Sequence, residues 1–184
     1  ELSYVPQVNR REQATKVLYI GNCWPFKWEQ MKNYVVALKE AFAGEFKIYG
    51  EGWPDGISEG PLGSREDTDL FAREVSNAKI NLSLHEPSQV LDFATSTNER
   101  LYKLLSLKSF VISDDCRADA HEFTPGRDFV VSAGGSDLVD KVEHYLKSDD
   151  ERSFVALQGY QRCVSLHTYR CRAQRVLHLL ESRQ

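Results

Sequence analysis

Short apolar runs alternate with longer amphipathic stretches along most of the chain. This alternation is typical of βαβ units, in which parallel strands are joined by helices that cover the sheet. The apolar runs predict five strands, at Lys16–Ile20, Phe46–Tyr49, Lys79–Leu84, Phe110–Ser113 and Phe129–Val131. The pattern therefore predicts an α/β fold with a Rossmann-like parallel sheet flanked by helices.

The segments between these runs have the periodicity of helices. Between the first two strands, Met31, Val35, Leu38 and Phe42 recur at the spacing of one helix face, and Gly44 follows as a stop signal. Further helices are expected at 67–77, 96–107 and 136–147. Ser96 with an acid three residues later forms a capping-box pattern, so the third of these four helices is predicted to begin at residue 96.

The tail from residue 149 to residue 184 is expected to be helical nearly throughout, with Gly159 as its weak point. Its apolar positions predict two consecutive helices that lie across the sheet or against a second domain. They include Phe154, Leu157, Tyr160, Val164, Tyr169, Val176, Leu177 and Leu180. We therefore divide the chain into a polar leader (1–15), a Rossmann-like unit (16–148) and C-terminal helices of the same domain (149–184).

Composition narrows the class of protein. A chain of 184 residues with 41% hydrophobic content can bury the core of one domain. The net charge of −4 argues against a surface that attracts nucleic acid or acidic lipid as a whole, so any anion site must be local. No apolar run approaches the ~20 residues of a membrane helix, and the start has no signal-peptide pattern. The four cysteines lack metal-ligand spacing, which indicates reduced thiols in a cytoplasmic protein and no metal site.

An open parallel sheet binds ligands at the carboxyl ends of its strands, where the winding changes direction. The usual strand order would place that point between the first strand and the strand at 110–113. Three segments are expected to converge there: the loop 21–27, the loop 85–95 and the start of the helix at 96–107. The Gly- and Pro-rich stretch 51–66 is expected to be an exposed loop of the kind that carries function.

Arg100 and Lys103 stand one turn apart on the predicted third helix, where their charges repel. One interpretation is that an anion lies between them, close to the amide groups of the helix start. The other is that Lys103 pairs with Glu99 on the surface, an i,i+4 contact worth only ~0.3–0.5 kcal/mol. A second acidic pattern, Asp-Thr-Asp at 67–69, is interpreted as the start of a helix rather than as a metal site.

Seven short segments, taken together, resemble the donor-binding half of GT-B glycosyltransferases, in particular the group 1 and spore-protein CgeB-like branch. They match in order and spacing from about residue 17 to residue 180. The segments are VLYIG (17–21), KIYGEGW (47–53), NAKINLSLH (77–85), NERLYK (98–103), EFTPGRDFV (122–130), DLVDKVEHYL (137–146) and HTYRCR (167–172).

The resemblance implies which residues hold the donor. Lys27 takes the place of a lysine that contacts the donor diphosphate, and Arg100 matches the arginine of the family. His85, at the end of the third strand, is a candidate partner of a sugar or phosphate oxygen, or a structural histidine. Trp53 either helps to seat the base or packs its loop. The implied donor-binding set is Gly21, Lys27, Gly50, Gly52, Trp53, His85, Arg100 and Lys103.

Three positions depart from the family pattern. Lys103 stands where a glutamate would hold the donor ribose, and Lys108 stands where a small residue or glycine follows the helix. The acidic pair of the related branch would need acids at Thr95 and Lys103, and neither is acidic. These departures imply that the donor is held differently or that donor binding has decayed.

The resemblance implies glycosyl transfer from a nucleotide diphosphate sugar to an unknown acceptor, without a metal or another cofactor. Cationic side chains would stabilise the charge that grows on the departing diphosphate. We assign no catalytic residue, because a second, N-terminal Rossmann-like domain would be needed, in the same chain or in a partner chain. The alternatives are a non-catalytic GT-B-like module that acts as an interaction scaffold, and a flavodoxin-like domain.

Overall fold

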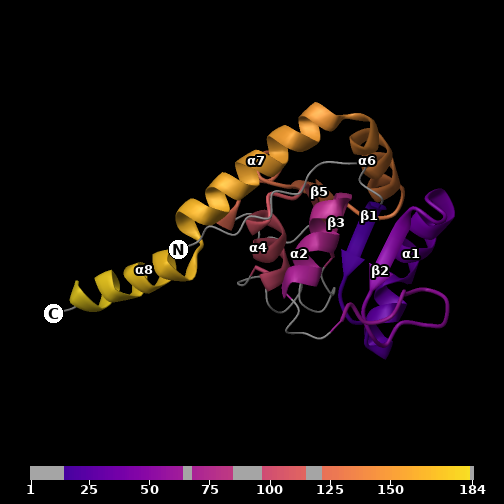
Figure 1. Ribbon diagram of the computed structural model, residues 1–184, viewed down its shortest axis with the longest axis horizontal. Coiled ribbons are helices and arrows are strands. Elements are labelled where there is room, and N and C mark those ends of the chain that lie inside the picture. The colour runs from indigo at the N-terminus through magenta and orange to yellow at the C-terminus, as the bar shows by residue number, and fades with distance from the viewer. Residues whose placement is uncertain (1–14, 64–67, 85–96, 115–121, 183–184) are drawn as a thin grey trace.

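The structure is a computed structural model that describes residues 15–63, 68–84, 97–114 and 122–182 (Figure 1). Its centre is a five-stranded sheet in the order β2-β1-β3-β4-β5, and every neighbouring pair of strands is parallel. The strands are β1 (Thr15–Ile20), β2 (Phe46–Tyr49), β3 (Ala78–Ser83), β4 (Val111–Asp114) and β5 (Val130–Ser132). The predicted strands and the predicted fold class are confirmed.

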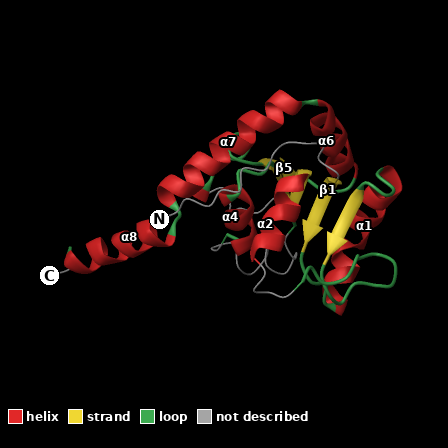
Figure 2. Cartoon of the chain, viewed as in Figure 1, coloured by secondary structure: helices red, strands yellow, loops and turns green. Residues whose placement is uncertain are grey.

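Helices cover both faces of the sheet (Figure 2). They are α1 (Pro25–Ala41), α2 (Thr68–Asn77), α4 (Glu99–Ser106), α6 (Ser136–Lys147), α7 (Asp149–Leu166) and α8 (Tyr169–Glu181). Helices α1 and α6 pack against each other and bury one hydrophobic cluster, while α2, α4 and the later part of α7 bury a second one. None of the described helices is long and apolar enough to cross a membrane.

The first crossover helix follows its sequence pattern closely. Met31, Val35 and Leu38 are almost completely buried, as the apolar spacing predicts. The helix begins at Pro25 because proline lacks the N–H that the first turn leaves unpaired and has a φ angle suited to that position. After the helix, Gly44 takes a φ of 77°, which lets the chain reverse toward β2.

The winding of the sheet changes direction between β1 and β3. β1 pairs with β2 on one side and with β3 on the other, so the strand at 110–113 lies one position further out than predicted. The expectation was wrong because the second crossover returns β3 to the free edge of β1. The carboxyl ends of β1 and β3 are therefore the ones that flank the switch point.

Helix α4 begins later than the capping-box pattern predicted. Its N-cap is Asn98, whose side-chain oxygen accepts a hydrogen bond of 2.8 Å from the backbone N–H of Arg100. The N–H of Leu101 is also bonded, to the carbonyl of Asn98 at 3.0 Å. Asparagine supplies this cap as well as serine does, and it uses amide groups that the anion hypothesis had assigned to a ligand. Ser96 lies outside the described residues.

The two consecutive helices expected in the tail are present, and Gly159, its expected weak point, does not interrupt the first of them. α7 runs unbroken through this residue and crosses from one helical layer toward the other. A Cβ at Gly159 would lie 2.2 Å from the carbonyl oxygen of Asp128, just before β5. Glycine is therefore present because the helix touches the sheet edge there, and the tail bends instead after His167.

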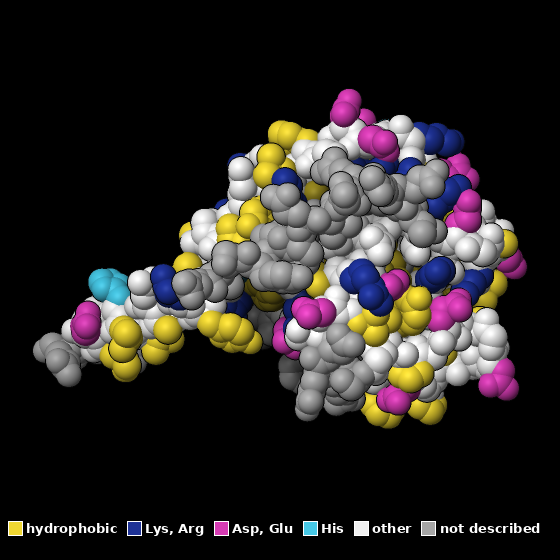
Figure 3. Space-filling model, in the orientation of Figure 1, with side chains coloured by type: hydrophobic (Ala, Val, Ile, Leu, Met, Phe, Trp, Pro, Cys, Tyr) yellow, Lys and Arg dark blue, Asp and Glu magenta, His cyan; other side chains and the backbone are white. Residues whose placement is uncertain are grey.

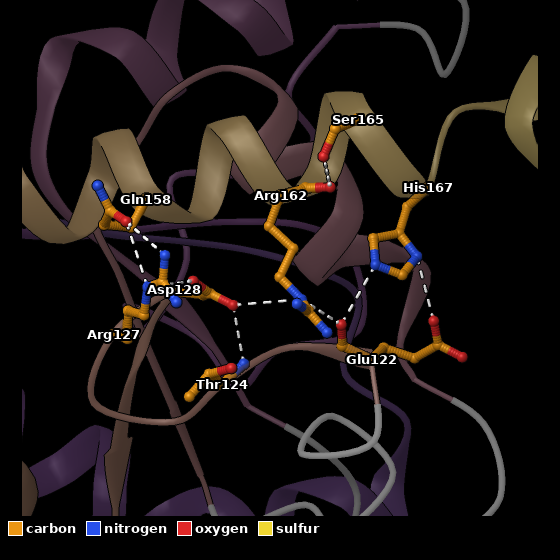
Figure 4. A network of polar contacts seen from close by, with 8 residues as sticks. All are labelled: Glu122, Thr124, Arg127, Asp128, Gln158, Arg162, Ser165 and His167. Atoms are coloured by element: carbon orange, nitrogen blue, oxygen red, sulfur yellow. Dashed lines mark hydrogen bonds and ion pairs between the residues drawn. The ribbon is translucent and has the colours of Figure 1, made fainter.

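A polar network holds the end of α7 against the segment that precedes β5 (Figure 4). The Arg162 side chain donates to the backbone carbonyl of Glu122 at 2.8 Å and lies 3.5 Å from the carboxylate of Asp128. The ring of His167 lies 3.1 Å from the carboxylate of Glu122 and 3.2 Å from its carbonyl oxygen. From this joint α8 projects away from the sheet, and it contains no buried residue (Figure 1).

Candidate functional site

The loop that follows β1 is held by the loop that follows β2. The N–H of Gly21 donates to the carbonyl of Tyr49 at 2.8 Å, and the N–H of Cys23 donates to the carbonyl of Glu51 at 2.8 Å. In the opposite direction, the N–H of Glu51 donates to the side-chain oxygen of Asn22 at 3.0 Å. These bonds extend the parallel pairing of β1 and β2 beyond the strands and fix the backbone at the carboxyl edge of the sheet.

Gly50 and Gly52 are needed for this close approach. A Cβ at Gly50 would lie 2.2 Å from the carbonyl oxygen of Gly21, and a Cβ at Gly52 would lie 2.0 Å from that of Cys23. Both glycines have positive φ angles, 147° and 78°, which other residues rarely adopt. The Gly-x-Gly pattern therefore has a structural function in holding the first loop.

Trp53 joins the two loops through its side chain. Its indole N–H donates to the carbonyl of Gly21 at 2.8 Å. Its ring meets the ring of Tyr19 edge to face, with 5.8 Å between centroids, and that of Trp28 in the same way at 6.3 Å. In this structure, Trp53 acts as the packing anchor of its loop.

Lys27 and Arg100, which come from distant parts of the chain, meet at the ring of Tyr19. The ammonium of Lys27 lies 5.8 Å from the ring centroid, and the guanidinium carbon of Arg100 lies 4.7 Å from it. Lys27 is 6% exposed and donates to the carbonyl of Asn22 at 2.7 Å. Arg100 donates to the carbonyl of Leu84, just after β3, at 3.0 Å. The two cations therefore lie at the β1/β3 switch point.

Lys103 takes a different place. Its ammonium lies 3.1 Å from the carboxylate of Glu99, and both side chains are largely exposed. This is the surface pair that the sequence allowed as the second interpretation. Lys103 also lines a pocket beside the sheet, whereas the described contacts of Arg100 are with Tyr19, Gly21 and Leu84. His85 and Thr95 lie outside the described residues.

Lys108, the other departure from the family pattern, has a φ of 55°. It follows α4 in the left-handed conformation that glycine adopts most easily. The positive φ angle thus explains why a small residue or glycine is expected at this position. Lysine is tolerated there because its side chain is exposed to solvent.

A pocket of about 660 Å³ opens at the carboxyl ends of β1 and β2. It is lined by Gly21, Asn22 and Gly50 from the loops after these strands, by the first half of α2 and by the end of α4. Sequence reasoning missed the residues that give it a mainly apolar lining, which are Ile20, Tyr49, Pro61, Leu62, Phe71, Ala72 and Leu107. The Gly- and Pro-rich composition of 51–66 was the available signal, because it pointed to a functional loop without specifying which residues face inward.

Several polar side chains also line the pocket. Thr68, Asp69, Ser106 and Lys103 line it from the helices, and Glu51 lines it from the second loop. Burial, with smaller effects from Glu74 and Glu59, raises the pKa of Tyr49 above its usual value of 10.0. Tyr49 is therefore a neutral hydroxyl at physiological pH. The pocket combines apolar surface with a few hydrogen-bonding groups, as small-molecule sites commonly do.

The sequence profile of a family described as glycosyl transferase-like matches residues 29–178. The chain belongs to this family. No curated protein sequence matches the chain.

Solved structures show the same fold at low sequence identity. A mutant of S. aureus TarM, solved with fondaparinux, alpha-GlcNAc-glycerol and UDP, has a TM-score of 0.66 and 14% identity over 96% of this chain and 37% of its own. Sucrose-phosphate synthase from Thermosynechococcus elongatus has a TM-score of 0.66 and 14% identity over 96% of this chain and 47% of its own. The C-terminal domain of the glycosyl transferase group 1 protein LpcC from Francisella tularensis has a TM-score of 0.60 and 15% identity over 89% of this chain and 95% of its own.

These likenesses establish the fold as that of a GT-B C-terminal domain. The chain spans less than half the length of TarM and of sucrose-phosphate synthase, but it matches almost the whole of the isolated LpcC domain. The predicted fold is thus confirmed at the level of GT-B. The flavodoxin-like alternative does not account for the two helices, α7 and α8, that follow the sheet.

Proposed function

We propose that this domain binds the nucleotide diphosphate sugar of a glycosyl transfer reaction. The observation that carries the proposal is the meeting of Lys27 and Arg100 at the ring of Tyr19, where the winding of the sheet changes direction. Two cationic side chains gathered at one ring favour an anion with delocalised negative charge. A diphosphate fits that description, and the neighbouring pocket offers room for its nucleoside.

The expected donor-binding residues take specific parts in this proposal. Lys27 and Arg100 contact the diphosphate, and Gly21 allows the backbone of the first loop to approach it. Gly50, Gly52 and Trp53 hold that loop in place. His85 is proposed as a partner of a sugar or phosphate oxygen.

The departure at Lys103 changes how the nucleoside would be held. A lysine can donate hydrogen bonds to ribose oxygens but cannot accept them from ribose hydroxyls, as a carboxylate would. The donor is therefore expected to be held more by its diphosphate and by the apolar pocket than by its ribose.

The chemistry proposed is departure of a nucleoside diphosphate from the sugar, stabilised by side-chain cations in place of a metal ion. We assign no catalytic base to this domain. An N-terminal Rossmann-like domain, in the same chain or in a partner chain, would supply the acceptor side. We place the protein in the CgeB-like branch and in the cytoplasm as parts of the same proposal.

Calorimetry with UDP, GDP and their sugars tests the site. Arg100→Ala and Lys27→Ala should each weaken binding by about tenfold or more, because each removes a charge-assisted contact worth ~1.5–3 kcal/mol. Lys32→Ala is the matched control, since Lys32 is an exposed lysine of α1 that pairs with Glu29 at 2.7 Å. Equal affinity in all the variants would exclude this site.

An assay of donor hydrolysis by the longest natural form of the protein tests the reaction. Release of nucleoside diphosphate that is lost in Arg100→Ala supports glycosyl transfer. Nucleotide binding without any turnover would instead support a domain that has kept its ligand and lost its chemistry.

A further inference from the structure

The side chain of Tyr19, which lies beside Lys27 and Arg100, is deeply buried although it carries a polar hydroxyl. Tyr19 is 1% exposed and is the last residue but one of β1, close to the carboxyl edge of the sheet. Its hydroxyl has no hydrogen-bond partner among the residues that the structure describes. A buried hydroxyl without a partner is unfavourable, so its presence here calls for an explanation.

The Tyr19 hydroxyl and the Arg100 guanidinium both lie close to Gly21. A Cβ placed on Gly21 would lie 3.0 Å from the Tyr19 hydroxyl oxygen and 2.6 Å from the Nη2 of Arg100. A glycine at position 21 therefore leaves both groups next to the backbone of the first loop. The ring below the hydroxyl contacts the guanidinium at 4.7 Å and the ammonium of Lys27 at 5.8 Å.

We propose that Tyr19 is a third anion-contacting residue, whose hydroxyl donates a hydrogen bond to a diphosphate oxygen held by Lys27 and Arg100. This inference rests on the proposed function and names a residue that the sequence pattern did not single out. Because Arg100 covers the hydroxyl from the side of Gly21, its guanidinium must shift toward the anion when the contact forms. The ring keeps the two cations close together in the free protein, and the hydroxyl completes the site when the anion is bound.

The inference predicts effects of opposite sign on stability and on binding. In the free protein, Tyr19→Phe removes an unpartnered buried hydroxyl and keeps the ring, so the midpoint of thermal unfolding should stay the same or rise. In the complex, the same change removes a hydrogen bond to a charged group, so the Kd for diphosphate should rise by about tenfold. A residue that only packs the core would not weaken binding while leaving the fold intact.

The experiment measures the Kd of inorganic diphosphate and of UDP by calorimetry, on the longest natural chain and its Tyr19→Phe variant. Tyr34→Phe is the matched control, because it makes the same chemical change on α1, where the tyrosine lies against Gly134. A Kd raised about tenfold in Tyr19→Phe but unchanged in Tyr34→Phe supports the inference.

The possible failures are distinguishable. If the unmodified protein binds diphosphate and Tyr19→Phe binds it equally well, the inference about Tyr19 is overturned and the proposed function stands. If the unmodified protein binds neither diphosphate nor UDP, both are overturned. If it binds diphosphate through Tyr19 but never releases nucleoside diphosphate from a donor, the glycosyl transfer reaction fails and the anion site remains.

Discussion

At the scale of single residues, backbone geometry explains several positions that chemistry alone would misread. Gly50 and Gly52 look like ligand-approach glycines, but each lies against a carbonyl oxygen of the first loop. Lys108 looks like the loss of a functional glycine, and its φ of 55° shows that the constraint is conformational. These residues affect the site through the loops and helix that they shape.

Lys108→Gly should raise the free energy of unfolding by ~0.5–1 kcal/mol. The left-handed conformation costs a side-chain-bearing residue ~1–2 kcal/mol, and the greater freedom of glycine in the unfolded chain offsets part of the gain. Urea unfolding measures the change. Lys103→Gly is the control, because it places glycine inside α4 and should lower stability by ~1 kcal/mol. A loss of stability in Lys108→Gly would show that the lysine side chain contributes more than its backbone costs.

At the scale of elements, the joint between α7 and α8 depends on a buried histidine. The His167 side chain is 4% exposed and packs against the rings of Phe123 and Tyr102, with centroid distances of 4.7 and 5.5 Å. Burial is the largest influence and lowers the pKa of His167 below 6.5. The nearby Arg172 and Arg162 lower it further, while Glu122 opposes them. The neutral ring is therefore the form that fits the joint.

This joint makes stability depend on pH. Below pH 6.5 the unfolded chain protonates His167 before the folded protein does, so the folded state loses stability as pH falls from about 6.5 toward the lowered folded pKa. The free energy of unfolding should fall between pH 7.5 and pH 5.5, and it should fall less in His167→Gln. His178→Gln is the control, because His178 is an exposed histidine of α8, and the stability of this variant should follow pH as that of the unmodified protein does. Identical pH dependence in His167→Gln would contradict the assignment.

At the scale of the whole molecule, α8 is amphipathic but unpacked within the described part of the chain. Tyr169, Val176, Leu177 and Leu180 lie at the spacing of one helix face, and each is more than half exposed. Figure 3 shows hydrophobic side chains along one side of the projecting C-terminal arm. The second domain that we propose would cover such a face, as the apolar pattern of the tail suggests.

Replacing Val176, Leu177 and Leu180 together with glutamine should change the free energy of unfolding of this domain by less than ~0.5 kcal/mol per residue, because none of the three is buried. Val155→Gln is the contrasting control, since Val155 of α7 is 6% exposed and its replacement should be strongly destabilising. Urea unfolding of both variants measures these changes in the free energy of unfolding. A large loss in the α8 variant would mean that α8 packs on its own domain in solution.

The sequence predicted the elements better than it predicted their ends and their arrangement. Met31, Val35 and Leu38 established α1 because helical periodicity is a local property. The start of α4 was misplaced because Asn98 provides the cap. Gly159 was identified only as a weak point of the tail, whereas its small size allows the helix to contact Asp128. The candidate site was predicted in part: Lys27 and Arg100 were identified as cations near one sheet edge, but Tyr19, at which they meet, is an ordinary strand residue in the sequence.

The sequence by itself determined the βαβ succession, the local character of any anion site and the membership in a glycosyltransferase-like family, because all three follow from residue types and their order along the chain. The tertiary structure decided which strand lies beside β1, which residues line the pocket and which side chains share the ring of Tyr19. The physical reason is that these depend on contacts between residues far apart in the chain, such as Lys27 and Arg100, whose proximity is set only when the sheet has formed.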